Sequence, residues 1–360
     1  MPRTTAVVLD NEPILDVSRP PRAPTPKARA PRNDYADLKR RVYAQGLMNR
    51  QYGYYARKGA VTAALLAVGL GVLLVGAGTW WVRLVDAVFL AFVFGQIALL
   101  GHDLAHLQII PSGRANTVVG LLVGNFLLGV SRGWWRDNHS AHHAHPNEMG
   151  EDPNIDILLL ATTPEQALGR PRWVRWVIRH QVPLLFPIFS LEFFSMHQQS
   201  IAFAWRRGPG ASRGEGWLLV GHFAVYFVLL PALIGVGEAL TFALVHRLVA
   251  GMYLGSIFAP NHKGMPLVER GDGRLDFLRE QVLTARNVRG GAVTDLVYGG
   301  LNYQIEHHLF PTMPRNRLRR AQPVVRAFCA ERGIVYYETG VVQSFREIMG
   351  HFGAVSAALA

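Results

Sequence analysis

The sequence has little cysteine, a deficit of acidic residues and no apolar run near its start. Its single cysteine, Cys329, excludes an internal disulfide framework and a zinc site built from cysteines. Lys and Arg number 37 against 25 Asp and Glu, yet no basic helix or aromatic-basic RNA motif is present, which argues against a nucleic-acid-binding protein. Residues 1–33 are rich in Pro and Arg and show no signal peptide, so we expect a disordered cytoplasmic arm.

Half of the 360 residues are apolar, and long uncharged segments dominate the middle of the chain. Because a helix needs about 20 apolar residues to cross a bilayer, we expect spans at about 60–80, 83–101, 217–236 and 239–260. The spans would form two helical hairpins. The expected fold class is an all-α membrane protein with four transmembrane helices and a cytoplasmic helical cap. The integral-membrane domain would cover residues 34–335, and residues 336–360 would form a C-terminal cytoplasmic tail.

Three local features leave alternatives open. Residues 34–58 suit an amphipathic helix, which either lies at the membrane interface or is solvated. The fourth span contains His246 and Arg247, so either that end reaches the membrane surface or Arg247 faces a protein interior. Residues 118–130 and 182–194 are apolar but too short to cross reliably, which indicates interfacial or re-entrant segments.

The distribution of charge predicts an orientation. Residues 1–58 hold twelve Lys or Arg, whereas the predicted loop between spans one and two offers at most Arg83. Since cytoplasmic loops of membrane proteins carry the excess of Lys and Arg, both termini should be cytoplasmic. The ends of spans two and four then lie on the same cytoplasmic side.

Three histidine clusters follow or lie between these spans. His102 and His106 are four residues apart, and the other two clusters, 139–143 and 304–308, each place their polar residues at i, i+3 and i+4. On a helix such spacings share one face, and neutral imidazole is the commonest metal ligand in proteins. The candidate metal ligands are His102, His106, His139, His142, His143, His307 and His308, with His262 after the fourth span as an eighth.

Eight imidazoles exceed what one ion can use, so we expect two metal ions. Nearby carboxylates could orient the ring N–H groups; these are Asp103, Asp137, Asp152, Asp156 and Glu306. His145 is out of phase with its cluster. The remaining isolated histidines are expected to be surface or satisfied core residues; they are His180, His197, His222, His246 and His351.

The pattern H-x3-H, H-x2-H-H and Q-x2-H-H, together with four spans, resembles the membrane-bound fatty acid desaturase family. The flanking runs Asn261-His262-Lys263-Gly264 and Leu309-Phe310-Pro311 agree, and the glutamine that opens the third box, Gln304, is similar to front-end and acyl-lipid desaturases. The resemblance covers about residues 55–335. It implies that the eight histidines hold two iron ions and that Gln304 binds iron directly, through water, or not at all. Zinc could replace iron in purified protein.

The resemblance also implies a reaction and partners. An O2-dependent enzyme would place a cis double bond in a lipid- or CoA-linked acyl chain. No His-Pro-Gly-Gly haem motif is present, so electrons would come from a separate ferredoxin- or cytochrome b5-like donor with its reductase, and a basic surface suits an acidic donor. Candidate walls of an acyl channel are Trp134, Trp135, Tyr253 and Phe258, for which ordinary packing is the alternative reading.

Rival functions remain open at this point. A hydroxylase or ketolase would share the same histidine boxes and differ in its product. A metal transporter would need polar ligands along a route through the bilayer, whereas these clusters gather at one face. A structural membrane adaptor would not need the histidines at all.

Overall fold

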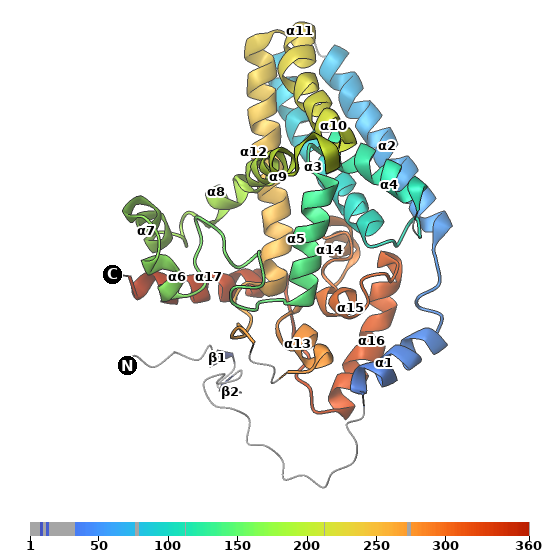
Figure 1. The fold of residues 1–360 in the computed structure, drawn as a ribbon, viewed down its shortest axis with the longest axis vertical. Helices are drawn as coiled ribbons and strands as arrows, with labels where there is room; N and C mark the ends of the chain where they lie inside the picture. The colour runs from blue at the N-terminus through green and yellow to red at the C-terminus, as the bar shows by residue number, and fades with distance from the viewer. Residues whose placement is uncertain are drawn as a thin grey trace.

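The computed structural model describes residues 8–9, 12–13, 33–75, 79–111, 113–211, 213–271 and 275–359. The predicted arm at 1–33 lies almost wholly outside these residues. Within it, β1 (Val8–Leu9) and β2 (Glu12–Pro13) pair in antiparallel fashion. The rest of the described chain is mainly helical, with long helices in the upper half of Figure 1 and shorter ones below.

Among the residues that the structure describes, four helical segments are long and apolar enough to cross a membrane, in agreement with the sequence. They are α2 (Tyr52–Val75), α3 (Trp80–Ala105), the segment Gly214–Ile234 and α12 (Val236–His262). The third segment is continuous through α10 (Arg213–Ala224), the π-helix η2 (Val225–Leu229) and α11 (Leu230–Ile234). Figure 1 shows these helices side by side.

The first two spans differ in their bounds from the hydropathy prediction. The first helix ends at Val75 and the second begins at Trp80, so the predicted boundary near residue 82 was wrong. Hydropathy stays high through Trp80-Trp81-Val82 and therefore does not mark the break.

The predicted amphipathic helix at 34–58 divides into two elements. Its first part is α1 (Asp34–Ala44), and its last residues belong to α2. Leu38 and Val42 of α1 are fully buried in a core shared with α16 (Arg315–Glu331). This apolar face is therefore covered by protein.

The short apolar stretch at 118–130 forms a sharp helical turn. The helices α4 (Arg114–Leu121) and η1 (Leu122–Leu128) run into α5 (Arg132–Ala144) with a bend of 101°. Gly129 makes the turn with φ +71°, and a Cβ there would lie 2.5 Å from the ring of His222. A larger residue would face both the left-handed backbone and that contact, so glycine suits the position. The stretch at 182–194 becomes α8 (Leu185–Ser190) and the start of α9 (Glu192–Ala211).

Arg247 faces the protein interior, which settles the open alternative in the fourth span. Its guanidinium lies 2.6 Å from His222 Nε2 and 3.0 Å from His197 Nε2, and 4.0 Å from the ring centre of Tyr226. His222 and His197 in turn lie within hydrogen-bonding distance of the carbonyl oxygens of Phe126 and Leu128 at the end of η1. Both histidines are buried core residues. His222 is satisfied at both nitrogens, because its Nε2 accepts from Arg247 and its Nδ1 donates to a carbonyl oxygen at a helix end.

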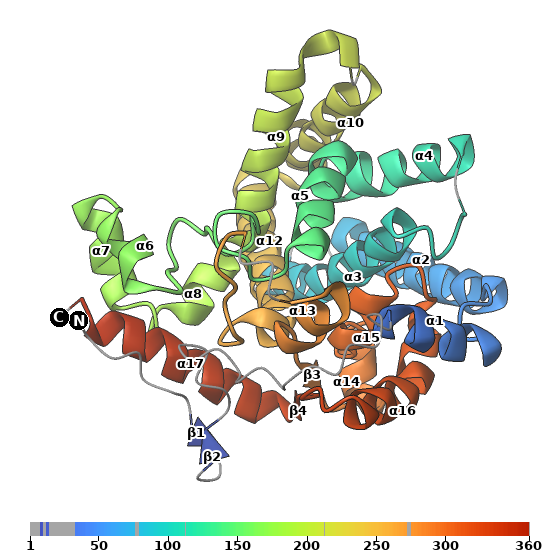
Figure 2. The ribbon, with the colours of Figure 1, turned by 60° about the horizontal axis from the view of Figure 1, so that its bottom comes forward.

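The remaining elements form a cap beneath the spans, seen obliquely from below in Figure 2. They are α6 (Pro164–Leu168), α7 (Arg172–Arg179), α13 (Phe277–Leu283), α14 (Ala292–Val297), α15 (Gln304–Leu309), α16 and α17 (Val341–Ala357). The strand β3 (Asn287–Val288) pairs in parallel with β4 (Glu338–Thr339).

The segment predicted as a C-terminal tail is an integral part of this cap. Ile348 and Phe352 of α17 are fully buried, and Glu347 forms a 2.5 Å ion pair with the buried Arg286. The prediction of a tail at 336–360 was therefore wrong. The apolar periodicity of residues 341–357 could have indicated a packed helix, since buried positions recur at helical spacing.

Candidate metal centre

Four separate elements bring the histidine clusters to one place. His102 lies in the last turn of α3 and His106 follows directly as its cap. His139, His142 and His143 lie on α5, His262 is the last residue of α12, and the short helix α15 carries His307 and His308. Each predicted helical face therefore exists, and the four elements converge below the spans.

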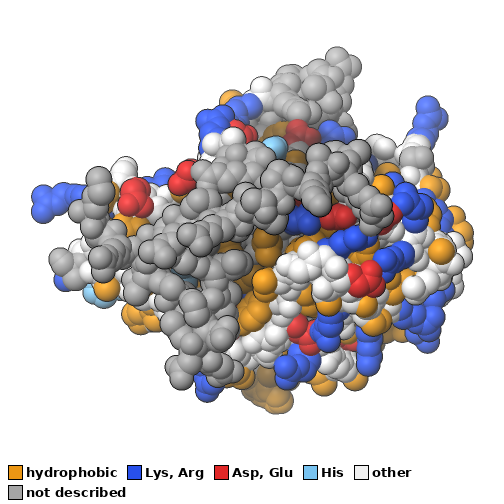
Figure 3. Space-filling view, turned by 90° about the horizontal axis from the view of Figure 1, so that it is seen from below, with side chains coloured by type: hydrophobic (Ala, Val, Ile, Leu, Met, Phe, Trp, Pro, Cys, Tyr) orange, Lys and Arg blue, Asp and Glu red, His pale blue; other side chains and the backbone are white. Residues whose placement is uncertain are grey.

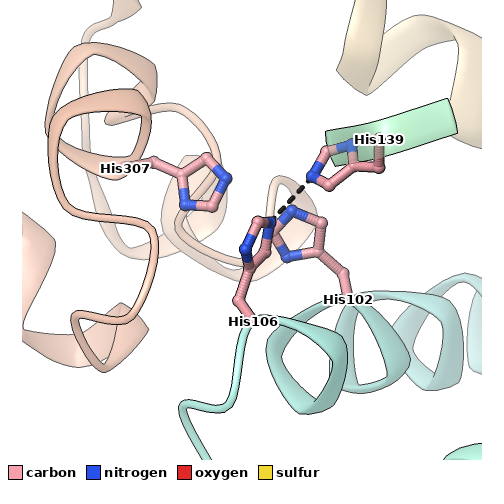
Figure 4. Close-up of side chains that lie close together, drawn as sticks. All are labelled: His102, His106, His139 and His307. Atoms are coloured by element: carbon pink, nitrogen blue, oxygen red, sulfur yellow. Dashed lines mark hydrogen bonds between the residues drawn. The ribbon is translucent and has the colours of Figure 1, made fainter. Parts of the chain in front are cut away.

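One group of four imidazoles surrounds a common space. Ring nitrogens of His102, His106, His139 and His307 all lie within 4.8 Å of one another. Figure 4 shows the rings directed at this space from α3, α5 and α15. The Nε2 atoms of His106 and His139 are only 2.8 Å apart.

A second group lies beside the first. His142, His262 and His308 also place ring nitrogens within 4.8 Å of one another. The ring of His143 stands between the groups, because its Nε2 is 3.1 Å from His139 Nε2 and its plane stacks on His308 at 4.2 Å between ring centres. All eight predicted ligands thus belong to one continuous cluster.

The outer nitrogens of the second group are held by hydrogen-bond acceptors. The Nδ1 atom of His262 lies 3.1 Å from the carbonyl oxygen of Thr284, and that of His308 lies 2.9 Å from Gln281 Oε1. Because these oxygens only accept, each Nδ1 carries the proton and each Nε2 presents a lone pair. The two Nε2 atoms nevertheless face each other at 3.1 Å. Neither Gln281 nor Thr284 stands in a motif that could have indicated this role.

Two of the five predicted carboxylates reach an imidazole. Asp152 Oδ2 lies 2.9 Å from His142 Nδ1, and Asp103 Oδ1 lies 3.3 Å from His102 Nδ1. Asp103 also pairs with the guanidinium of Arg315, at the start of α16, a contact that local sequence patterns did not reveal. The arrangement of metal ligand, carboxylate and further partner is typical of metal centres.

The other three carboxylates have different partners. Glu306 points away from the cluster, where it accepts from Asn287 Nδ2 at 2.7 Å and from the hydroxyl of Tyr336 at 2.8 Å. It therefore fixes α15 to β3 and does not orient an imidazole, because on a helix it faces opposite to His308. Asp156 is largely exposed and pairs with Arg170. Asp137 pairs with Arg136 at 3.2 Å on the solvent side of α5.

Gln304 contacts the second group through its amide. Its Oε1, the atom able to bind a metal, accepts from Asn261 Nδ2 at 3.1 Å, and its Nε2 lies 3.0 Å from His262 Nε2. The amide thus donates to a candidate ligand nitrogen. Gln304 is buried in the same wall as His307 and His308.

The electrostatic state of the cluster suits metal binding. Burial and the neighbouring imidazoles lower the pKa of His307 and His308 well below the usual value for histidine, so both rings are neutral at pH 7. Neither nitrogen of the His307 ring has a hydrogen-bond partner among the described residues, although the side chain is 1% exposed. Buried polar atoms are normally satisfied. Neutral, unsatisfied imidazoles that share a space fit a bound cation.

An apolar pocket adjoins the cluster. It reaches His102 and Trp135 at the cluster and is enclosed by α3, α4, η1, α5, α9 and α12. Of the four predicted channel residues, Trp135 and Phe258 line it. Trp134 and Tyr253 do not; the hydroxyl of Tyr253 instead donates to the carbonyl of Val297 at 2.5 Å. The lining residues are Ala98, Leu99, Gly101, His102, Ala105, Gly120, Gly124, Leu128, Val130, Arg132, Trp135, Phe193, Met196, Leu254 and Phe258.

The chain matches known proteins over most of its length. A family model described as fatty acid desaturase matches residues 78–340. The acyl-lipid (9-3)-desaturase of Physcomitrium patens is 30% identical over 99% of this chain and 68% of its own length. The Delta(5) fatty acid desaturase fat-4 of Caenorhabditis elegans is 31% identical over 87% of this chain and 73% of its own length. The Delta(8)-fatty-acid desaturase of Euglena gracilis is 29% identical, with shares of 88% and 76%.

Proposed function

Since this chain belongs to the fatty acid desaturase family and is an oxidoreductase, we propose that it introduces a cis double bond into a lipid- or CoA-linked acyl chain with O2 and a di-iron centre. The observation that carries the proposal is the buried cluster in which two groups of ring nitrogens converge, with both nitrogens of His307 lacking a hydrogen-bond partner among the described residues. Neutral imidazoles that direct lone pairs into one buried space repel each other unless a cation lies between them.

The two groups would hold one ion each. The first ion would take His102, His106, His139 and His307, and the second would take His142, His262 and His308, with His143 within reach of both. Imidazole suits iron but also zinc, so zinc can occupy the same sites in purified protein. Gln304 would contact the second site through His262 or through a bound water.

Iron in these sites would supply the reduction of dioxygen and the removal of hydrogen from an unactivated methylene, which no side chain can do alone. The net change removes two hydrogens from adjacent carbons, and O2 becomes two waters by taking up these hydrogens, two electrons from the donor and two protons from solvent. The protein contributes position. His102 and Trp135 belong both to the cluster and to the wall of the apolar pocket. An acyl chain in that pocket would lie against the ligand shell, with water excluded.

The electron donor and the orientation complete the proposal. The excess of Lys and Arg outside the spans supports a cytoplasmic location for both termini and for the cap. A separate ferredoxin- or cytochrome b5-like protein would then deliver electrons at the exposed face of the cap. Figure 3 shows Lys and Arg side chains gathered on the right of that face, on the side where α1 and α16 lie.

Expression in a host that lacks polyunsaturated lipids tests this function. Fatty-acid profiling should reveal a new cis double bond with the wild-type chain. His143→Ala should abolish the product, because it removes a ring between both groups. His180→Ala should not, since the ring of His180 contacts Trp176 at the end of α7 and does not belong to the cluster. An oxygenated acyl chain without a new double bond would indicate a hydroxylase or ketolase and overturn desaturation.

A further inference from the structure

One charged side chain lines the pocket that adjoins the histidine cluster. Arg132 is the first residue of α5, directly after the turn from η1, and its side chain is half-buried. The rest of the pocket wall is apolar apart from His102. A half-buried cation in an apolar wall is unfavourable unless an anion or strong acceptor meets it.

The guanidinium is held in a built site. Its Nη2 donates to Asn116 Oδ1 at 3.1 Å, and Asn116 is itself buried and donates to the carbonyl oxygens of Leu104 and Ile110. The side chain lies across Gly120, where a Cβ would come within 2.6 Å of Arg132 Nε. Glycine at 120 therefore leaves the space that this arginine occupies.

No carboxylate among the described residues lies within ion-pair distance of Arg132. Glu215 is the nearest acidic residue in the hydrogen-bond network, but its Oε2 accepts from Ser131 Oγ at 2.8 Å. Arg136, one turn further along α5, is more exposed and pairs with Asp137. Among the described residues, the guanidinium of Arg132 thus hydrogen-bonds only to a neutral amide, and the carboxylate of Glu215 acts on its charge through space.

The surroundings of Arg132 favour a lipid. The re-entrant segment next to it exposes Val118, Leu122 and Phe126, which suits contact with a membrane. His139 follows Arg132 by seven residues on α5, so the two lie about 10 Å apart along the helix axis. An anion at Arg132 would hold the head of an acyl substrate at that separation from the histidine cluster.

We propose that Arg132 binds the phosphate of a membrane phospholipid whose acyl chain occupies the pocket. This inference rests on the proposed function and extends it, because it names the acyl carrier. It also implies that the reacting carbons are close to the carboxyl end of the chain, since the cluster begins only two helical turns from the head group.

Lipid binding to the full-length protein without reductant tests this site independently of turnover. The probes share one oleoyl chain: lysophosphatidylglycerol, oleoyl-CoA and neutral monooleoylglycerol. Wild-type protein should bind the lysophospholipid roughly 10-fold more tightly than the neutral lipid, as expected for a charged hydrogen bond. Arg132→Gln should remove this preference. Arg114→Gln, an exposed arginine on α4 that does not line the pocket, should retain it.

Three results would overturn the proposal. First, the preference for the lysophospholipid could persist in Arg132→Gln. Second, oleoyl-CoA could bind more tightly than the lysophospholipid and lose this advantage in Arg132→Gln, which would identify CoA as the acyl carrier. Third, Arg132→Lys keeps the charge and should keep most of the preference. Complete loss of the preference in this variant, at an unchanged unfolding temperature, would indicate that Arg132 has a purely structural role. A wild-type chain that yields no desaturated product would contradict the proposed function without altering these binding results.

Discussion

The imidazole rings of the second group are each fixed on the side away from the shared space. Asp152, Thr284 and Gln281 accept from the Nδ1 atoms of His142, His262 and His308. Such contacts set the tautomer and the direction of each ring, and they usually affect metal affinity strongly. The three acceptors come from a loop, a helix cap and α13, so the geometry depends on tertiary packing.

A carboxylate pair tests this point at the scale of single residues. Asp152→Ala should weaken metal binding roughly 10- to 100-fold, because His142 loses the acceptor that orients it. Asp156→Ala should leave the affinity unchanged, since Asp156 is exposed and pairs with Arg170. Titration with Zn²⁺ under a competing chelator would measure both. Equal affinities in the two variants would show that Asp152 has no orienting role.

The sequence predicted the eight histidines but not all of their partners. The i, i+3 and i+4 spacing is a local property of a helix, so His139, His142 and His143 could be assigned to one face. Glu306 also lies within a histidine box, yet it points to Asn287 and Tyr336. Which neighbouring element a side chain of this short helix faces is decided by tertiary packing and not by the spacing of residues in the sequence.

Among the elements, α17 was the least expected. Ile348 and Phe352 pack in one core with residues of α12 and α8, and Val355 packs with residues of α7. The ion pair of Glu347 with Arg286 is buried. Arg286 in turn donates to the carbonyl oxygens of Pro260 and Lys263, on either side of His262. The final helix therefore supports the segment that carries a candidate ligand.

Truncation of a side chain on α17 should destabilise the whole cap. Phe352→Ala should cost about 3–5 kcal/mol, as is usual for a fully buried aromatic residue. Val342→Ala on the same helix should change stability little, because Val342 is 64% exposed. Thermal unfolding in detergent would compare the two. A loss in Phe352→Ala no larger than that in Val342→Ala would mean that residues 336–360 behave as a tail.

The spans were predictable in number because about 20 apolar residues are a strong signal. Their bounds were less so, since Trp80 and Trp81 continue the apolar run across the break. The bend between η1 and α5 was expected only as a short segment unable to cross. Its angle depends on Gly129 and on the contacts of Arg247, which come from distant parts of the chain.

At the scale of the whole molecule, exposed arginines lie at both ends of the cap, on α16 and on α7. Figure 2 shows α16 and α7 on opposite sides of it. α16 exposes Arg319 and Arg320, and its first residue, Arg315, contacts Asp103 beside His102. An electron donor bound to α16 would therefore be linked to the histidine cluster through the contact of Arg315 with Asp103.

Charge reversal on α16 should slow electron delivery. The double variant Arg319→Glu and Arg320→Glu should lower the rate of oxidation of a reduced acidic ferredoxin, and the wild-type rate should fall as ionic strength rises. Arg172→Glu on α7 changes an exposed arginine far from α16 and should have little effect. Stopped-flow measurement of donor oxidation distinguishes these variants. Equal slowing by Arg172→Glu would place the donor elsewhere.

The two-metal centre is tested most directly by anomalous scattering from crystals of the purified protein, recorded at the iron and zinc edges. We predict two peaks in each chain, one among His102, His106, His139 and His307 and one among His142, His262 and His308. A single peak, or peaks outside the histidine cluster, would contradict a centre built from all eight imidazoles.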